Sequence, residues 1–428
     1  MHLKKTSNIS KIDLVPISRH KYSEFVVSLF LNIYTITNCG LRKSVDLFKY
    51  LNETLGWNLP DVPCFNSVLN WLEKSGYSIY TGTNDRLSGA DYASIIDESI
   101  MLGSERMILN LGIKAEKTTA TALNYSDIEV IGIHVDYSWN ASKIEDCLKE
   151  DERKMEQKPS YVISDNDKKL QNAIANYQCV HIRDIGHTLA MFLERVYSKE
   201  EDFCNFFKQI GKLKNTEAVS NCSYLLPPRQ RSIARFMNLS GSILWGRKII
   251  ESFERFTEKE QQVYRFVVDN KALISELGSA FECINKILPL IKNVGLSYDS
   301  IETSMKLIDK LATCENKRIA KFSALSRNYL LEELTKLPDS QTKYNASSDI
   351  IESAFEYYKF KKSRNALHGV TAYVLILPLI TKMKTVGEGI DTNFKTNLEH
   401  VYMRDLWQFK RDVLIENQTI NRRKKLVS

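Results

Sequence analysis

The spacing of apolar residues along the chain changes from one stretch to the next. Between residues 20 and 80 apolar positions recur every three to four residues, which predicts helices at 22–36, 41–55 and 64–74. A loop at 56–63, with one glycine and two prolines, interrupts this pattern. The third helix turns apolar residues inward and polar residues outward; the outward residues are Asn66, Ser67, Asn70 and Lys74.

Three short helices of which the last has a polar face resemble a helix-turn-helix unit. We therefore expect residues 1–88 to form an N-terminal helical domain that binds DNA through the four polar residues of its third helix. A plain helical bundle is the alternative, because three short helices occur in many proteins that do not bind DNA.

From about residue 90 the apolar pattern becomes that of β-strands, with turn residues between them. Strands are predicted at 92–101, 106–115, 130–136, 161–164 and 179–185, and helices at 142–157, 168–176 and 186–197. Three strands in succession followed by alternating helices and strands are typical of a mixed sheet flanked by helices. The sequence therefore predicts an α/β protein.

Residues 198–340 have almost no strand pattern and are expected to form a helical insertion. Its predicted helices are 202–213, 242–256, 260–277, 281–294 and 300–312. A strong helix at 349–360 and an apolar helix at 371–382 follow, and the chain ends in a basic tail at 421–425.

The composition is that of a globular protein, with 43% hydrophobic and 26% charged residues. A formal net charge of +7 permits a polyanionic partner without requiring one. Eight cysteines without a CxxC pair argue against a zinc ribbon and fit reduced thiols. The first residues lack the apolar core of a signal peptide, and the longest apolar runs are too short to span a bilayer. We expect a soluble cytoplasmic protein with no membrane partner.

Three acidic residues from distant segments are the candidates for chemistry. Asp97 follows two isoleucines in a predicted strand, Asp165 directly follows the strand 161–164, and Glu352 lies in the helix 349–360. Open α/β sheets place their sites at the carboxyl ends of strands. We expect the three carboxylates to converge on divalent metal ions and to cut phosphodiester bonds.

Each of these acids has a neighbour that competes for its role. Glu98 follows Asp97, but alternation along a strand points the two side chains to opposite faces. Asp167 is suited to cap the helix that begins at residue 168. Glu356 lies one turn after Glu352 on the same helical face, and either can be a solvated surface acid. The sequence leaves the third acid open between these two.

The segments around these acids resemble the catalytic segments of DDE transposases, which have a ribonuclease H-like fold. Residues 95–99 and 162–167 resemble the surroundings of the first two acids, and residues 351–359 resemble the helix that carries the third. In many insertion-sequence transposases a lysine that contacts the DNA end follows this glutamate after six residues, as Lys359 follows Glu352. Seven positions correspond to almost two helical turns, so the side chains of Glu352 and Lys359 lie on the same face of the predicted helix. The opposing apolar stripe is Ile351, Ala354, Phe355 and Tyr358.

The resemblance covers roughly residues 90–200 and 345–385. The interval of 187 residues from Asp165 to Glu352 (352 − 165) resembles that of family members with an inserted domain. At two positions this chain differs from the subgroup that has the glutamate–lysine spacing. The subgroup often has an arginine four residues before the glutamate, where this chain has Ser348, and a tyrosine further upstream, where this chain has Asn345. The acid triad is therefore better supported than membership of that subgroup.

The resemblance implies an insertion-sequence DDE transposase with a ribonuclease H-like mixed sheet flanked by helices. The expected parts are an N-terminal helical DNA-binding domain (1–88), the first part of the core (89–198), an all-helical insertion (199–344), the acidic helix with the following helix (345–395), and a C-terminal helix with a basic tail (396–428).

The same resemblance implies the cofactors and partners. Asp97, Asp165 and Glu352 would hold two Mg²⁺ (or Mn²⁺) ions. The partners would be double-stranded DNA, as terminal inverted repeats and target DNA, and a second copy of the chain in a DNA-bound homodimer. In a prokaryote the protein would be associated with the nucleoid.

Several further residues are weaker candidates. Lys361, Lys362 and Arg364 follow the acidic helix and are expected to contact backbone phosphates, a solvated basic turn being the alternative. Trp245 in the insertion is a candidate for stacking on a flipped base, although a core position is favoured. His187 and Asp184 lie at a strand–helix junction, where a capped structural histidine is favoured.

Two rival functions fit the same residues. One is a ribonuclease H-like nuclease or resolvase without strand transfer. The other is a domesticated, catalytically silent DNA-binding protein, against which the intact set of three acids argues.

Overall fold

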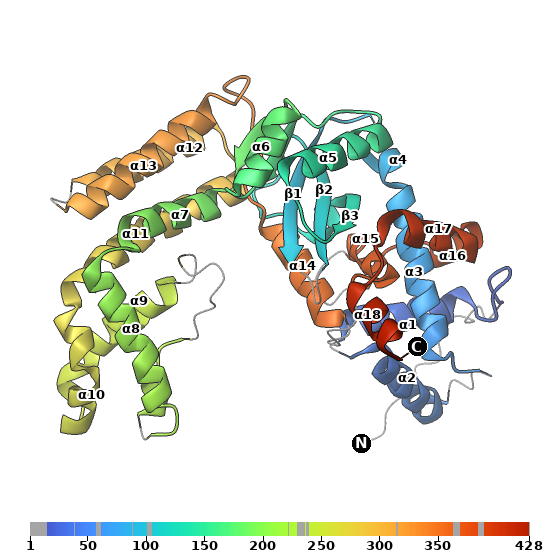
Figure 1. Ribbon diagram of the computed structural model, residues 1–428, viewed down its shortest axis with the longest axis horizontal. Coiled ribbons are helices and arrows are strands. Elements are labelled where there is room, and N and C mark those ends of the chain that lie inside the picture. The colour runs from blue at the N-terminus through green and yellow to red at the C-terminus, as the bar shows by residue number, and fades with distance from the viewer. Residues whose placement is uncertain are drawn as a thin grey trace, which may run out of the picture. The chain divides into compact units, whose positions relative to one another are not determined.

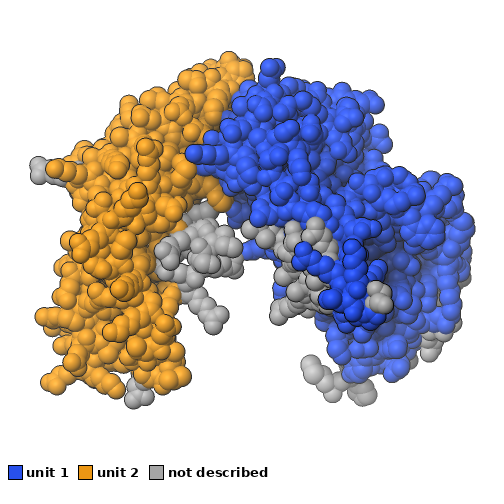
Figure 2. Space-filling view, viewed as in Figure 1, with its two compact units in different colours: residues 1–115, 123–181, 348–428 blue, residues 116–122, 182–347 orange. Residues whose placement is uncertain are grey.

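The computed structural model describes residues 15–37, 39–56, 61–87, 89–100, 105–220, 222–228, 236, 239–313, 316–362, 369–383 and 389–427. The chain divides into two compact units (Figure 2). Unit 1 consists of residues 1–115, 123–181 and 348–428, and unit 2 consists of residues 116–122 and 182–347. All three candidate acids belong to unit 1.

A five-stranded mixed sheet with the strand order β3-β2-β1-β4-β5 organises the α/β part of the chain (Figure 1). The strands are β1 (Tyr92–Ile100), β2 (Arg106–Lys114), β3 (Glu129–Asp136), β4 (Tyr161–Ser164) and β5 (Val180–Arg183). β2 pairs antiparallel with both β1 and β3, whereas β4 pairs parallel with β1. The prediction of three successive strands followed by alternating elements, forming a mixed sheet flanked by helices, is confirmed.

Helices α5 (Ala141–Met155) and α6 (Lys168–Asn176) cover one face of this sheet. Ile96, Ile108 and Val162 project from β1, β2 and β4 into a core shared with both helices. The side chain of Asn140 accepts from the backbone N–H of Lys143 and so caps α5. Because alternate residues of a strand face opposite ways, Ile95 and Asp97 of β1 belong to the other face.

Helix α14 (Asp349–Lys361) packs against β1. Its buried residues are Ile350, Ile351, Ala354, Phe355 and Tyr358. The predicted apolar stripe is therefore the face by which this helix is held. The apolar helix expected at 371–382 is shorter, a 3-10 turn η5 (Ala372–Leu375) followed by α15 (Ile376–Ile380). The rest of the C-terminal segment comprises α16 (Phe394–His400), α17 (Met403–Val413) and α18 (Gln418–Val427).

The three predicted N-terminal helices are present as α1 (Glu24–Ile36), α2 (Leu41–Leu55) and α3 (Phe65–Thr81), and a short α4 (Thr83–Leu87) follows. α3 continues past Lys74, its predicted end, because Ile79 extends its buried stripe and the helix packs against α15, α16 and η5. Within unit 1 these helices thus share contacts with the C-terminal segment.

Unit 2 is built almost entirely of helices. They are α7 (Ile185–Tyr197), α8 (Glu201–Thr216), α9 (Leu239–Ser252), α10 (Glu258–Asp269), α11 (Lys271–Pro289), α12 (Tyr298–Ala312) and α13 (Lys317–Leu334), with short turns η2 (Ser223–Leu225), η3 (Phe253–Arg255) and η4 (Leu290–Val294). The single helix predicted at 260–277 is wrong, since the chain breaks at Asn270, whose side chain donates to the Phe266 carbonyl at 2.8 Å. Helix α13 was not among the predicted helices.

Gly76 is the point where α3 approaches η5 most closely. A Cβ built at Gly76 would lie 1.9 Å from the backbone oxygen of Leu375. We expect Gly76→Ala to lower the free energy of unfolding by about 3 kcal/mol, because the backbone must move to admit the methyl group. Thermal unfolding followed by circular dichroism measures this change.

A matched control is Gly211→Ala in α8, where a Cβ meets nothing within 4 Å. Alanine there is expected to stabilise the helix by about 0.5–1 kcal/mol. Equal effects of the two substitutions would contradict the close approach of α3 and η5.

Candidate active site

Asp97 and Asp165 occupy equivalent positions on neighbouring parallel strands. Ser94 pairs with Val162 and Ile95 with Ile163, an offset of 68 residues (162 − 94). Asp97 and Asp165 have the same offset (165 − 97), so this register, continued by two residues, puts them side by side. Adjacent strands lie about 4.8 Å apart, so this register would bring the backbones of the two aspartates close together.

Glu98 lies on the opposite face from Asp97, as alternation predicts. Its carboxylate pairs with Arg106 of β2 at 2.9 Å and with Lys169 of α6. Only 10% of the Glu98 side chain is exposed, whereas its two basic partners are partly exposed. Glu98 therefore joins the sheet to α6, whereas Asp97 faces the side of the sheet on which α14 lies.

Asp165 and Asp167 also have separate roles. The Asp167 carboxylate accepts from the backbone N–H of Lys169 at 2.7 Å and caps α6. The Asp165 carboxylate accepts from the backbone N–H of Asp167 at 2.9 Å, which fixes the turn immediately after β4. The capping role therefore belongs to Asp167, and Asp165 remains the acid at the end of the strand.

Helix α14 brings Glu352, Glu356 and Lys359 to the side of the sheet where Asp97 lies. Burial lowers the pKa of the Lys359 ammonium, and the carboxylates of Asp97, Glu356 and Glu352 partly oppose this shift. The Lys359 ammonium also lies 5.7 Å from the centre of the Phe355 ring. The carboxylates of Asp97 and of the acidic face of α14 thus both interact electrostatically with Lys359. In the sequence, 255 positions separate Asp97 from Glu352 (352 − 97).

Tyr125 contacts the flank of α14 next to Glu356. Its hydroxyl donates to the Ser353 carbonyl at 3.1 Å, and its ring meets Tyr357 edge-on at 6.4 Å. Burial raises the pKa of the Tyr125 phenol, and the Glu356 carboxylate adds to the shift. Tyr125 was not among the candidate residues predicted from the sequence. Its aromatic character, unusual in a polar turn, was the available signal.

The chemistry of the donor set suits a hard divalent cation. Asp97, Asp165 and Glu352 offer carboxylate oxygens, the ligands that Mg²⁺ prefers, and the set contains neither thiolate nor imidazole. Across the residues that the structure describes, no three histidine, cysteine, aspartate or glutamate side chains are gathered closely enough to form a metal centre. The two aspartates are brought together by register, and Glu352 is presented from α14.

The basic residues after Glu352 differ in their surroundings. The Lys361 ammonium donates to the carbonyls of Tyr34 and Thr37 at the end of α1, and burial lowers the pKa of Lys361 to about 8. Lys362 is only 5% exposed, and its ammonium has no hydrogen-bond partner within the described residues. Arg364 lies outside the described residues. Lys361 therefore links α14 to α1 through hydrogen bonds, and Lys362 is buried, so neither side chain is a surface cation as predicted.

The polar residues predicted to line the DNA-binding helix lie between the first turn and the middle of α3. Asn66 and Asn70 are exposed, and Ser67 and Lys74 are half-buried. Burial lowers the pKa of Lys74, and Arg19 adds to this effect. The asparagines are therefore the members of this set that are most accessible to a partner.

The candidates in unit 2 have structural partners. The Trp245 indole donates to the Leu225 carbonyl at 2.7 Å and is 9% exposed, which agrees with the favoured core position. Asp184 caps α7, since its carboxylate accepts from the backbone N–H of His187 at 2.7 Å. This geometry agrees with the favoured interpretation, a structural histidine in the capped first turn of α7.

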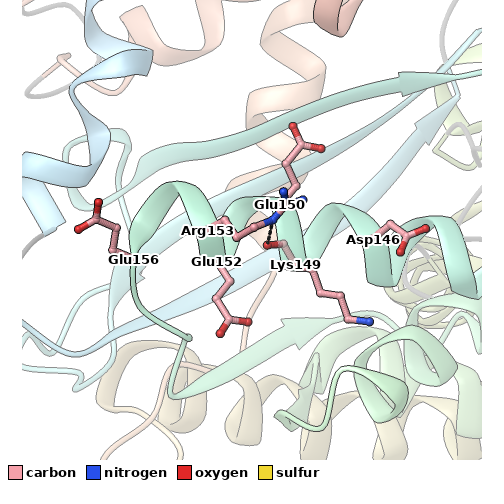
Figure 3. A pocket seen from close by; sticks show the side chains of 6 residues that line it. All are labelled: Asp146, Lys149, Glu150, Glu152, Arg153 and Glu156. Carbon is pink, nitrogen blue, oxygen red and sulfur yellow. Dashed lines mark hydrogen bonds between the residues drawn. The ribbon is translucent and has the colours of Figure 1, made fainter.

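An open groove of about 740 Å³ runs along α5 (Figure 3). It is lined by Asp146, Lys149, Glu150, Glu152, Arg153 and Glu156. Four acids against two bases give it a charge that repels phosphate. It lies on the helix that covers the face of the sheet opposite Asp97, so it does not belong to the candidate site.

Within the described part of the chain, no helix combines the length and the apolar character needed to cross a membrane. The chain matches no model of a known protein family, and a search of curated proteins finds no significantly similar sequence.

Proposed function

We propose that this chain is a DDE-type DNA transposase, which binds the ends of a mobile element, cleaves them and joins them to target DNA. The observation that supports this most directly is the parallel register of β1 and β4, which, continued by two residues, sets Asp97 of β1 beside Asp165, the residue after β4. Helix α14, with Glu352 and Lys359 on one face, packs against the strand that carries Asp97.

The strand arrangement supports a ribonuclease H-like core. Three consecutive antiparallel strands are extended at β1 by the parallel strand β4, and β5 follows at the edge. The third acid comes from a helix after a long, mostly helical stretch. Both features agree with the fold that the sequence resemblance implies.

In this proposal Asp97, Asp165 and Glu352 hold two Mg²⁺ (or Mn²⁺) ions. Bound ions of this kind activate water or a 3′-hydroxyl and stabilise the leaving oxygen of a phosphodiester. The protein's part would be to present two carboxylates from neighbouring strands and a third from α14 to the ions, and Lys359 would supply a cation beside them for the DNA end. The first half of α3, with exposed Asn66 and Asn70, is the proposed surface for terminal repeats. Two copies of the chain would act together, since two ends must be cut.

The test is a cleavage assay with the purified chain and a labelled duplex that carries the inverted repeats flanking its gene. With Mg²⁺ we expect a nick that leaves a 3′-hydroxyl at the repeat end, followed by a joined product when target DNA is added. Asp165→Asn should lower the cleavage rate by about three orders of magnitude, because it removes a carboxylate that holds the metal.

Asp167→Asn is the matched control, because Asp167 caps α6, a role that asparagine also fills, and should leave the cleavage rate close to that of the wild type. Equal cleavage by the wild type and Asp165→Asn would refute the mechanism. Cleavage without any joined product would instead favour the nuclease or resolvase.

A further inference from the structure

Helix α18 is anchored at the same edge of the sheet as the two aspartates. Asn417, the residue before the helix, lies close enough to the Glu105 carboxylate to lower its pKa, although burial has the larger, opposite effect. The Tyr137 hydroxyl donates a hydrogen bond to the Glu416 carbonyl. Glu105 directly precedes β2, and Tyr137 directly follows β3.

The pairing of the strands defines which edge this is. Ile100, the last residue of β1, pairs with Arg106, and Arg106 pairs with Asp136 at the end of β3. Glu105 and Tyr137 therefore lie at the end of the sheet where β1 ends, three residues past Asp97. Asp165 belongs to this edge too, because β4 runs parallel to β1. The base of α18 and the candidate acids thus share one edge of unit 1.

The helix itself is strongly cationic. Its ten residues, Gln418–Val427, include Arg422, Arg423, Lys424 and Lys425 and contain no acidic residue. All four cations are exposed. At about 1.5 Å per residue the helix is about 15 Å long, so its charges stay within reach of a duplex held at the acids. The helix dipole favours basic residues in the last turn of a helix, but this stabilising effect does not require four consecutive basic residues.

A carboxylate site needs nearby positive charge if it is to accept a polyanion. On α14, Lys359 supplies one cation beside the acids and Lys361 donates to backbone carbonyls, whereas Lys362, the residue after the helix, is buried. Further exposed cations, anchored at the edge where the acids lie, are provided by α18.

We infer that α18 is a phosphate-binding arm that holds the backbone of duplex DNA against the Asp97–Asp165 edge. This inference rests on the proposed function for its substrate, but binding does not require metal or cleavage. Contacts of this kind are independent of base sequence. The arm would add affinity for any duplex and leave the choice of sequence to other elements.

The test measures binding of the full chain to a labelled duplex of arbitrary sequence, about three helical turns long, in EDTA. The variant replaces Arg422, Arg423, Lys424 and Lys425 with glutamine. We expect its Kd to rise at least tenfold and the slope of log K against log salt to fall by about 0.9 for each phosphate that the variant no longer neutralises. Unchanged circular dichroism and thermal midpoint would show that the fold is retained.

A control with the same loss of charge replaces Lys114, Lys149, Arg153 and Lys158, which are exposed residues on β2, on α5 and after it. Lys114 pairs with Tyr92 at the opposite edge of the sheet. The inference is overturned if the two variants lose equal affinity, if the wild type does not bind the duplex, or if it binds phosphatidylserine vesicles in preference to DNA.

The outcomes separate this inference from the proposed function. Loss of binding confined to the α18 variant, with a wild type that does not cleave, supports the arm and refutes the transposase. Mg²⁺-dependent cleavage by a wild type whose α18 variant binds like the control supports the transposase and refutes the arm.

Discussion

Glu352→Gln is expected to reduce Mg²⁺-dependent strand cleavage by about three orders of magnitude, whereas Glu356→Gln should stay close to the wild-type rate. Glutamine keeps the size of the side chain but removes the charge that binds a divalent cation. Glu352 is half-buried in the first turn of α14, whereas Glu356 is exposed and lies near Tyr125. Single-turnover cleavage of labelled repeat DNA measures both rates.

The pair is a sharp comparison because both glutamates lie on one face of one helix and both act on Lys359. Substituting either leaves the buried stripe of α14 intact, so a difference in rate reports on the site and not on folding. The reverse pattern, with loss only in Glu356→Gln, would transfer the third role to Glu356. If both variants cleave DNA at the wild-type rate, neither glutamate acts as the third metal ligand beside the two aspartates, and the proposed mechanism is contradicted.

The parts of this fold that could be predicted are those governed by local periodicity. The helix α14 was found because burial of one face imposes a helical period, and the strands β1, β2 and β3 were found as short apolar runs between turn residues. The separate positions of Asp97 and Glu98 followed from strand alternation alone, and the ion pairs of Glu98 agree with them.

The parts that could not be predicted depend on partners far away in the sequence. Lys361 resembled a surface cation, but its bonds are to carbonyls 327 and 324 positions earlier, in α1 and after it. Helix α3 ended too early in the prediction because its second half is defined by contacts with α15 and α16. Such contacts do not produce a regular spacing of apolar residues, so they cannot be predicted from local sequence patterns.

A buried cluster between β2, β3 and α5 is a further example. The His134 imidazole contacts the Asp151 carboxylate at 3.0 Å, and the Asn110 amide donates to the same carboxylate at 2.7 Å. Asp151 is 4% exposed. A Cβ at Gly132 would lie 2.3 Å from this carboxylate, so the glycine of β3 makes room for it. None of these residues stood out in the sequence.

Asp151→Asn is expected to lower the free energy of unfolding by about 3 kcal/mol at pH 6, because it leaves a buried imidazolium without its counter-charge. Burial alone would lower the pKa of His134, but the Asp151 carboxylate outweighs it and raises that pKa well above its usual value. A raised pKa in the folded state adds stability that is fully present below about pH 6.5, the unfolded value, and is lost as pH rises through the folded pKa.

The difference between wild type and Asp151→Asn should therefore shrink as pH rises toward the folded pKa of His134. Urea unfolding at a series of pH values measures it, with Asp146→Asn, an exposed acid on the same helix, as the control that should change little. A pH-independent difference would show that Asp151 acts through packing and its bond to Asn110 alone. The cluster would then be a neutral hydrogen-bonded network, and the stability of unit 1 would not depend on the ionisation of His134.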